Sequence, residues 1–259
     1  MTKQCISNNA PKKVNVIGVP ISVVNIDIVL DYISSNFDDI RGNYICASNV
    51  HTTVMAYDDK NYHKVQSESI ISLPDGKPLA TLGNKKGYKE MQKTTGTHFM
   101  QATFTDDRFK NKKHYFYGST KENLEEMIKK VKNDYPNLEI CGYEPSIFKE
   151  LDEKALEELI YRINSSNADF VWIGIGAPRQ EILMNRLKEK TNSLMTGVGG
   201  AFNILSGKVK DAPKWMQNAG LEWFYRFIKE PRRLFKRYFV TNSKFIWYNW
   251  RDKLWKIDI

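Results

Sequence analysis

Short apolar runs alternate with segments of helical periodicity through most of this chain. The clearest example is 170–175, a continuous apolar run typical of a strand buried on both faces, and 194–198 is predicted to be another buried strand. Residues 121–135 instead place apolar side chains three and four positions apart, as an amphipathic helix does. This alternation predicts an α/β fold with a mostly parallel sheet covered by helices.

The remaining elements follow the same two patterns. Further strands are expected at 14–19, 44–47, 70–73, 113–117 and 139–141. Further helices are expected at 26–37 with Asn25 as cap, at 50–57, around His63, at 151–164 and at 181–190, and Ser119 or Thr120 can cap the helix at 121–135. Ligands of open parallel sheets bind beyond the carboxyl ends of the strands, so the loops there form the candidate site.

The last 52 residues differ in composition from the rest. They hold 13 of the 39 Lys and Arg residues, 5 of the 30 Asp and Glu residues, and five of the six tryptophans. The first 207 residues are therefore nearly neutral, and we expect a body at 1–207 and a helical appendage at 208–259. A basic, aromatic appendage suits an anionic membrane surface or a nucleic acid, and it also suits a packed helix pair with a solvated basic face.

Several classes are disfavoured by composition. No apolar run reaches the roughly 18 residues of a membrane span, and residues 1–13 lack the apolar core of a signal peptide. Cys5, Cys46 and Cys141 are too few and too widely spaced for a disulfide framework or a Cys metal site. We therefore expect a cytoplasmic protein that meets any membrane from its inner face.

Four strand ends carry residues suited to chemistry: 47–52, 73–76, 174–181 and 197–203. The glycines of the last two loops can bring backbone N–H groups close to a phosphate, although tight turns also need glycine. Pro178 and Arg179 stand where the dinucleotide motif G-x-G-x-x-G needs its final residues, which disfavours a nucleotide-dependent oxidoreductase or methyltransferase.

Asp75 lies between a proline and a glycine just past a buried strand, where it can act as a general base or simply bond its own turn. Gln180 and Glu181 begin a helix, where their side chains can cap the helix and complement its dipole or can bind a ligand. The chain has no H-E-x-x-H and no D-x-D, so we expect metal-independent chemistry without a cofactor.

One long run, 197–238, together with LPDGKPL at 73–79, GIGAPRQE at 174–181, YPNLEICGY at 135–143 and SNVHT at 48–52, resembles the WecG/TagA/CpsF glycosyltransferases. The motifs follow the family's order, and the resemblance covers residues 14–238. It implies a Rossmann-like body with helices on both faces of the sheet and a C-terminal helical appendage. It also implies inverting transfer from a UDP-sugar, often an N-acetylhexosamine such as N-acetylmannosamine, to an undecaprenyl-diphosphate-linked sugar during synthesis of capsule, exopolysaccharide or teichoic acid.

The resemblance also assigns roles. It makes Asp75 the catalytic base and places Gln180 in the sugar-nucleotide pocket. Arg226 and Arg233, with Arg237 or the neighbouring Lys236, would close over the diphosphate. The other expected substrate-binding residues, from the same loops, are Asn49, Lys93, Thr95, Gly96, Gly174, Gly176, Arg179, Glu181, Gly199, Gly200 and Phe202.

Four positions depart from the family's pattern, and they leave the donor sugar and the acceptor open. This chain has Asn203 and His98 where the family usually has an acidic residue. It has Asp211 where the family usually has an arginine, and Ala47 where a hydroxyl residue is common. The expected partners are a UDP-sugar, a lipid-diphosphate-linked acceptor and the cytoplasmic membrane surface, without nucleic acid. The sequence is compatible with a homo-oligomer and sets no oligomeric state. The alternative is a non-catalytic nucleotide- or nucleic-acid-binding α/β protein with a basic tail.

Overall fold

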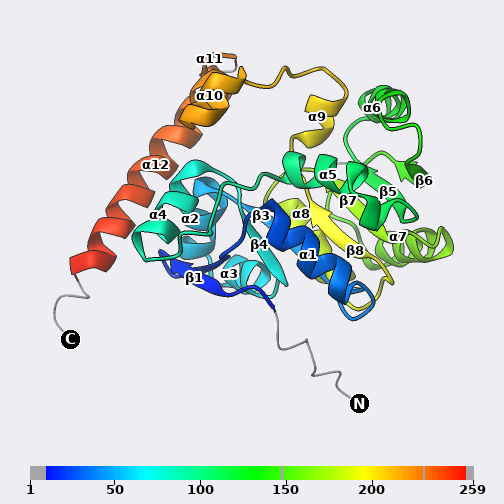
Figure 1. Cartoon of the computed structure of the whole chain (residues 1–259), viewed down its shortest axis with the longest axis horizontal. Helices are drawn as coiled ribbons and strands as arrows, with labels where there is room; N and C mark the ends of the chain where they lie inside the picture. Colours follow the sequence, from blue (N-terminus) through cyan, green and yellow to red (C-terminus); the bar gives the residue numbers. More distant parts are fainter. Residues whose placement is uncertain (1–9, 147–148, 230, 255–259) are drawn as a thin grey trace.

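The computed structural model describes residues 10–146, 149–229 and 231–254, apart from the side chains of Lys214, Gln217, Asn218, Arg226, Arg233, Lys236, Arg237 and 252–254. Within these residues, six parallel strands form one sheet (Figure 1). The expected α/β class is confirmed. From edge to edge the strands are β4 (Ile71–Pro74), β3 (Tyr44–Ser48), β8 (Leu194–Gly197), β7 (Phe170–Gly174), β5 (Lys113–Gly118) and β6 (Glu139–Glu144).

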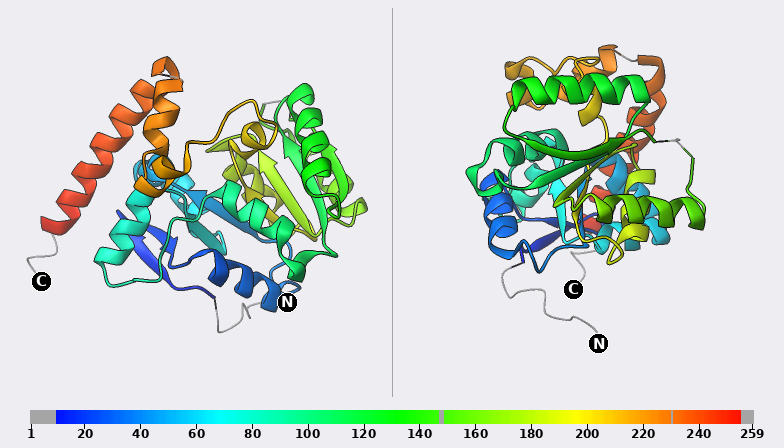
Figure 2. Two further views of the ribbon diagram at one scale, coloured as in Figure 1. Left: turned by 45° about the horizontal axis from the view of Figure 1, so that its top comes forward. Right: turned by 90° about the vertical axis from the view of Figure 1, so that its right-hand side faces the viewer.

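Helices cover both faces of this sheet, and Figure 2 shows α6 and α7 on opposite sides of it. The central strands β3, β7 and β8 are buried along their whole length, as the apolar run of β7 and the mainly apolar sequences of β3 and β8 predict. One face packs against α1 (Ile26–Asn36), α5 (Gly96–Thr105), η1 (Asp107–Phe109), α6 (Lys121–Asp134) and α9 (Ala201–Leu205). The other packs against α7 (Glu153–Ser165) and α8 (Arg179–Leu187).

Residues 14–19, expected as one strand, instead contribute to a two-stranded antiparallel hairpin. Its strands are β1 (Lys13–Val16) and β2 (Val19–Ser22). The chain turns at Ile17 and Gly18, both with positive φ, and the Asn15 side chain accepts a hydrogen bond from the Gly18 N–H over 2.6 Å. A third apolar cluster joins this hairpin to α2 (Val50–Asp58), α3 (Lys60–Ser67) and α4 (Lys77–Lys85).

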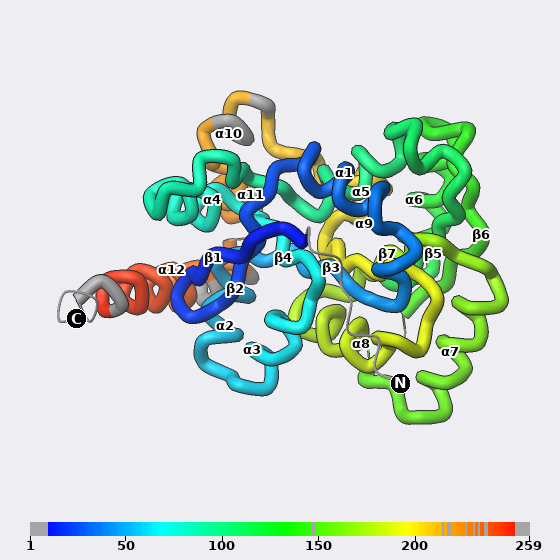
Figure 3. Tube along the Cα trace, turned by 60° about the horizontal axis from the view of Figure 1, so that its bottom comes forward, coloured from blue at the N-terminus to red at the C-terminus, as the bar shows by residue number. Residues whose placement is uncertain are grey.

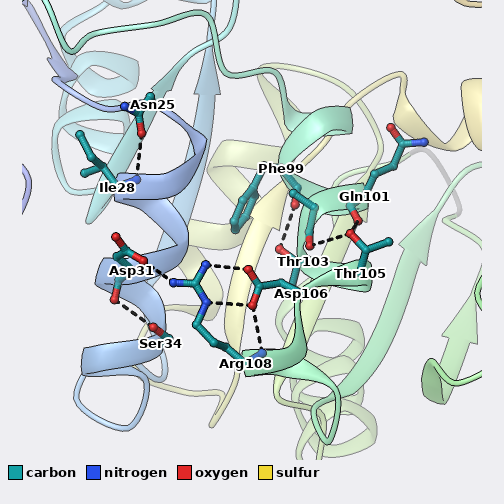
Figure 4. Close-up of polar contacts among 11 residues, drawn as sticks. Asn25, Ile28, Asp31, Ser34, Phe99, Gln101, Thr103, Thr105, Asp106 and Arg108 are labelled. Atoms are coloured by element: carbon teal, nitrogen blue, oxygen red, sulfur yellow. Dashed lines mark hydrogen bonds and ion pairs between the residues drawn. The ribbon is translucent and has the colours of Figure 1, made fainter.

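Side-chain hydrogen bonds define the ends of α1 and α5 (Figure 4). Asn25 caps α1, as expected, by accepting from the Ile28 N–H over 2.9 Å. Arg108 pairs with Asp106 at 2.6 Å and also with Asp31 of α1. These contacts fasten α1 to the segment after α5, on the face of the sheet that carries both helices.

The C-terminal segment forms α10 (Lys214–Ala219), α11 (Glu222–Lys229) and α12 (Pro231–Leu254). Figure 3 shows α12 lying beside α2 at the outside of the body. Phe245 of α12 is buried in the cluster of the hairpin and α2. Lys244 and Tyr248 reach the same carboxylate, Asp58, at 2.7 and 2.6 Å. Among the described residues, no helix combines the length and apolar character that a membrane span requires.

Candidate active site

The sheet order brings the four predicted strand-end loops together. β4, β3, β8 and β7 are consecutive neighbours and run parallel, so their carboxyl ends share one edge of the sheet. Asn49 follows β3, Asp75 follows β4, and the two glycine loops follow β7 and β8. Residues separated by up to 150 positions in the sequence therefore face the same space.

Asp75 is held by the neighbouring strand. Its N–H donates to the Ser48 carbonyl and to the Leu73 carbonyl, both over 2.8 Å. Its side chain is half-buried, and Gly76, with φ of 132°, starts α4 directly after it. Asp75 thus sits on a backbone fixed by both β3 and its own turn, as its position between Pro74 and Gly76 indicated.

Asn49 and Thr95 each cap a helix that begins at this edge. The Asn49 amide oxygen accepts from the N–H groups of His51 and Thr52 over 3.0 and 3.2 Å, which fixes the start of α2. Thr95 accepts from the His98 N–H over 3.1 Å at the start of α5. Gly96 lies against the ends of β3 and β8, where an added Cβ would come within 3.2 Å of the Val198 Cα.

The predicted glycines divide into two kinds. A Cβ at Gly174 would lie 2.7 Å from the ring of Phe202, itself fully buried, so this glycine and Phe202 serve the packing of α9 on β7. A Cβ at Gly176 or Gly200 would have no described heavy atom within 4 Å. Space in front of the sheet edge therefore lies at Gly176 and Gly200.

Gln180 ties the two glycine loops to each other. Its Oε1 accepts from the Gly176 N–H over 3.1 Å and from the Gly199 N–H over 3.0 Å. Its Nε2 donates to Glu181 Oε1 over 2.8 Å. The side chain is only 3% exposed and lies over Gly197, where a Cβ would approach Nε2 to 2.9 Å. The N–H groups of Gly176 and Gly199, which we expected to meet a phosphate, are engaged with this amide.

Glu181 lies behind Gln180 and is completely buried. Burial raises the pKa of this carboxyl to about 7, although hydrogen bonds from Gln180, from the backbone and from Tyr62 favour the ionised form. With no exposed surface, the Glu181 side chain backs the loop instead of facing solvent. Arg179, one residue before Gln180, is exposed at the start of α8.

The C-terminal helices reach this edge through two lysines of the body. Lys93 Nζ forms an ion pair with Glu222 Oε2 of α11 at 2.7 Å. Lys77 Nζ donates to the Ala219 carbonyl of α10 over 3.2 Å. Arg226, Arg233 and Arg237 lie on α11 and α12, but their side chains are outside the described part of the chain, and their predicted roles stay predictions.

The structure describes the surroundings of three of the positions that depart from the family's pattern, Asn203, Ala47 and His98. The Asn203 Oδ1 accepts from Asn123 Nδ2 over 2.9 Å, and Asn123 also bonds Ser119 and Ser206. An amide at 203 can therefore join this network of neutral groups. Ala47 is buried beside Gly96, and His98 is exposed in the first turn of α5.

Sequence reasoning missed two sets of residues at this edge. One is Lys77 and Glu222, whose contacts depend on how the C-terminal helices fold back. The other is a group of buried polar side chains beneath the loops: Ser48, Tyr62, Gln66 and Ser72. Serines inside otherwise apolar strands were the available signal for the second set, because a buried hydroxyl needs a partner.

Comparison with known proteins identifies the family of the chain. A sequence model of the glycosyl transferase WecG/TagA/CpsF family matches residues 14–258. A Bacillus subtilis N-acetylglucosaminyldiphosphoundecaprenol N-acetyl-beta-D-mannosaminyltransferase is 29% identical over 217 residues, which cover 83% of each chain. The protein of the same description from Bacillus spizizenii is 29% identical over 197 residues, covering 76% of this chain and 75% of the relative. The chain described here is thus a glycosyltransferase and belongs to the WecG/TagA/CpsF family.

Proposed function

We propose that this protein transfers N-acetylmannosamine from its UDP derivative to a lipid-diphosphate-linked N-acetylglucosamine, with inversion at the anomeric carbon. The acceptor and the transferred sugar are those in the names of the two Bacillus relatives. The observation that carries the proposal is the placement of Asp75 at the same sheet edge as the Gly176 and Gly200 loops, within a chain of this family. Asp75 can then face an acceptor while the loops face a nucleotide sugar.

Asp75 acts as the general base in this proposal. The acceptor hydroxyl attacks the anomeric carbon and gives its proton to the Asp75 carboxylate. A glycosidic C–O bond forms as the bond between the anomeric carbon and the diphosphate oxygen breaks, and UDP leaves with the electron pair. The hydrogen bonds from the Asp75 N–H to the carbonyls of Ser48 and Leu73 fix the backbone that carries this carboxylate.

The charge on the departing diphosphate needs cations close by. Because the Gly176 and Gly199 N–H groups are held by Gln180, we assign this role to the arginines of α11 and α12. The Lys93–Glu222 ion pair supports the assignment, since it places α11 beside a lysine of the site. Residues 208–259 thus act as an appendage that completes the site of a body at 1–207.

The appendage also binds the inner face of the cytoplasmic membrane in this proposal. Trp247, Trp250 and Ile246 of α12 are exposed, as are Phe235 and Phe239. An exposed apolar face on a basic segment fits an anionic membrane interface, where aromatic rings sit among the headgroups. A lipid-linked acceptor lies in that surface, so the same helix brings the site to its substrate.

A donor and acceptor screen tests the function directly. The full chain is incubated with a short-chain lipid-diphosphate N-acetylglucosamine acceptor and with UDP-N-acetylmannosamine, UDP-N-acetylglucosamine or UDP-glucose. Mass spectrometry is expected to show one added N-acetylhexosamine with the first donor only, and NMR of the product to show the inverted linkage. Activity in EDTA checks the metal-independent chemistry. Transfer of a different sugar, or from a donor other than a UDP-sugar, contradicts the proposal.

A further inference from the structure

A chain of buried polar side chains runs beneath the candidate site. It begins at Gln180, whose Oε1 joins the N–H groups of Gly176 and Gly199 and whose Nε2 donates to Glu181. Glu181 in turn interacts with the phenol of Tyr62 on α3. This first half of the chain connects the loops after β7 and β8 to a helix that belongs to the other side of the site.

The second half leads to the strands that carry Asn49 and Asp75. Gln66 Nε2 donates to the Tyr62 hydroxyl over 2.9 Å, and Ser48 Oγ donates to Gln66 Oε1 over 2.7 Å. Ser48 Oγ also lies 2.6 Å from Ser72 Oγ of β4. The carbonyl of Ser48 holds the Asp75 N–H, so the chain reaches the backbone of the proposed base.

Glu181 is the member whose chemistry is hardest to explain by stability alone. Its side chain has no exposed surface, and its Oε2 has no hydrogen-bond partner among the described residues. The titratable groups that face it are Tyr62 from α3 and Tyr44 and Cys46 from β3, none of them a cation. Burying a carboxyl without a cation is unfavourable, and an apolar side chain would fill this space at lower cost.

The neighbouring amide supplies the explanation. An unconstrained glutamine amide can rotate by half a turn and exchange its oxygen and nitrogen. A carboxyl at position 181 accepts a hydrogen bond in either protonation state, so it fixes Nε2 of Gln180 on its own side. Oε1 then points at Gly176 and Gly199, and one acceptor atom sets the distance between the two loops.

We propose that Glu181 is a positioning residue for sugar transfer: it orients the Gln180 amide so that the Gly176 and Gly199 loops are held in one arrangement at the strand ends. What these loops bind rests on the proposed function. How they are held rests on the hydrogen bonds alone. The proposal separates Glu181 from the residues that contact substrate.

We call the contact of Gln180 with the Gly176 and Gly199 N–H groups, held by Glu181, the clamp. Hydrogen exchange of these two glycine amides tests the clamp without any substrate. In the wild-type protein both amides should be protected, and Glu181→Met, which fills the site without an acceptor, should speed their exchange at least about ten-fold relative to amides of β7. Glu181→Gln keeps an acceptor oxygen and should retain the protection. Leu187→Ala, which creates a cavity in the same helix about two turns beyond Gln180, is the matched control and should leave both glycine amides protected. Rapid exchange of either glycine amide in folded wild-type protein overturns the proposal without any variant.

Donor kinetics test the consequence for transfer. Below the melting temperature of each variant, Glu181→Met should lower kcat/KM for the donor by about 10–100-fold, because loops displaced by an ångström misplace the reacting atoms. Glu181→Gln and Leu187→Ala should stay within about three-fold of wild type at the same temperature. If Glu181→Met only lowers the melting temperature and keeps normal kinetics, Glu181 is structural and the proposal is wrong. Protected glycine amides in a wild-type protein that transfers no sugar would instead support the clamp and refute the proposed function.

Discussion

The body and the C-terminal helices of this protein use their apolar residues differently. In the body, β3, β7 and β8 bury every residue between layers of helices. In α12, Phe245 is buried against the body, whereas Phe239 and Ile246 are 67% and 68% exposed. The single helix α12 therefore has one apolar face buried against the body and a second apolar face exposed.

This difference shows that the central strands of the body are fully covered by packing, whereas part of the apolar surface of α12 is left uncovered. Exposed apolar side chains beside basic residues are typical of a surface that contacts a membrane or another molecule. We therefore expect the inner face of α12 to contribute to folding stability and the outer face to contribute to partner binding. Substitutions on the two faces should therefore have separable effects.

The largest expected effect is on chemistry at the body's strand ends. Asp75→Asn should lower the transfer rate by about 10²–10⁴-fold, because an amide cannot accept the acceptor's proton. Its melting temperature and UDP affinity, measured by calorimetry, should match those of wild type. Wild-type turnover of the variant on a verified acceptor would remove Asp75 as the base.

The inner face of α12 should respond with a loss of stability. Phe245→Ala should cost about 3–5 kcal/mol, as expected for a large aromatic side chain removed from a core. Urea denaturation followed by circular dichroism measures this cost. An unchanged midpoint would show that α12 does not dock on the hairpin and α2 in solution.

The body also contains a group whose stability effect depends on pH. Burial raises the pKa of Glu181 from 4.5 to about 7, so the folded protein binds this proton more tightly than the unfolded chain does. Wild-type stability should therefore fall as pH rises from about 4.5 to about 7, by up to roughly 3 kcal/mol. Glu181→Gln, which cannot ionise, should lack this fall and be more stable than wild type at pH 8 but not at pH 4. The melting temperature of each protein is measured at several pH values in this range. The same dependence of melting temperature on pH in both proteins would refute the raised pKa.

The same contrast explains what the sequence alone predicted. Periodicity located most strands and helices of the body, and strand ends located the candidate site, because burial on a sheet imposes a regular pattern. It missed the turn at Ile17 and Gly18, since a β-branched residue with positive φ is rare. It also missed α4, which begins at Lys77 after Gly76 and has Pro78 in its first turn. The Lys93–Glu222 ion pair joins residues far apart in the sequence, and no local pattern encodes such a contact. The hydrogen bond between Gln180 and Glu181 depends on the burial of a carboxyl group, which local sequence does not predict either.

The outer face of α12 should affect membrane binding without affecting folding. Trp247→Ala with Trp250→Ala should weaken binding to anionic liposomes by about ten-fold, because less apolar area enters the interface. The melting temperature and the activity on a water-soluble acceptor should stay as in wild type, in contrast to Phe245→Ala. Loss of stability and of both activities together would show that these tryptophans pack the helix, and the membrane assignment would then be wrong.

The smallest expected effect concerns the polar contact between the two regions. Partial burial works to raise the pKa of Asp58, but the hydrogen bonds from Lys244 and Tyr248, together with the charge of Lys244, outweigh it and lower the pKa. The contribution of this carboxylate to stability is therefore present above its unfolded pKa of 3.8 and is lost as pH falls through the lower folded value. Asp58 and Lys244 are exposed, so Asp58→Asn should cost no more than about 1 kcal/mol at pH 7, and less at high salt. Asp39→Asn, at an exposed carboxylate after α1, is the control and should cost nothing measurable. A cost for Asp58→Asn as large as that of Phe245→Ala would mean that the charge contact, and not the apolar inner face, holds α12 on the body.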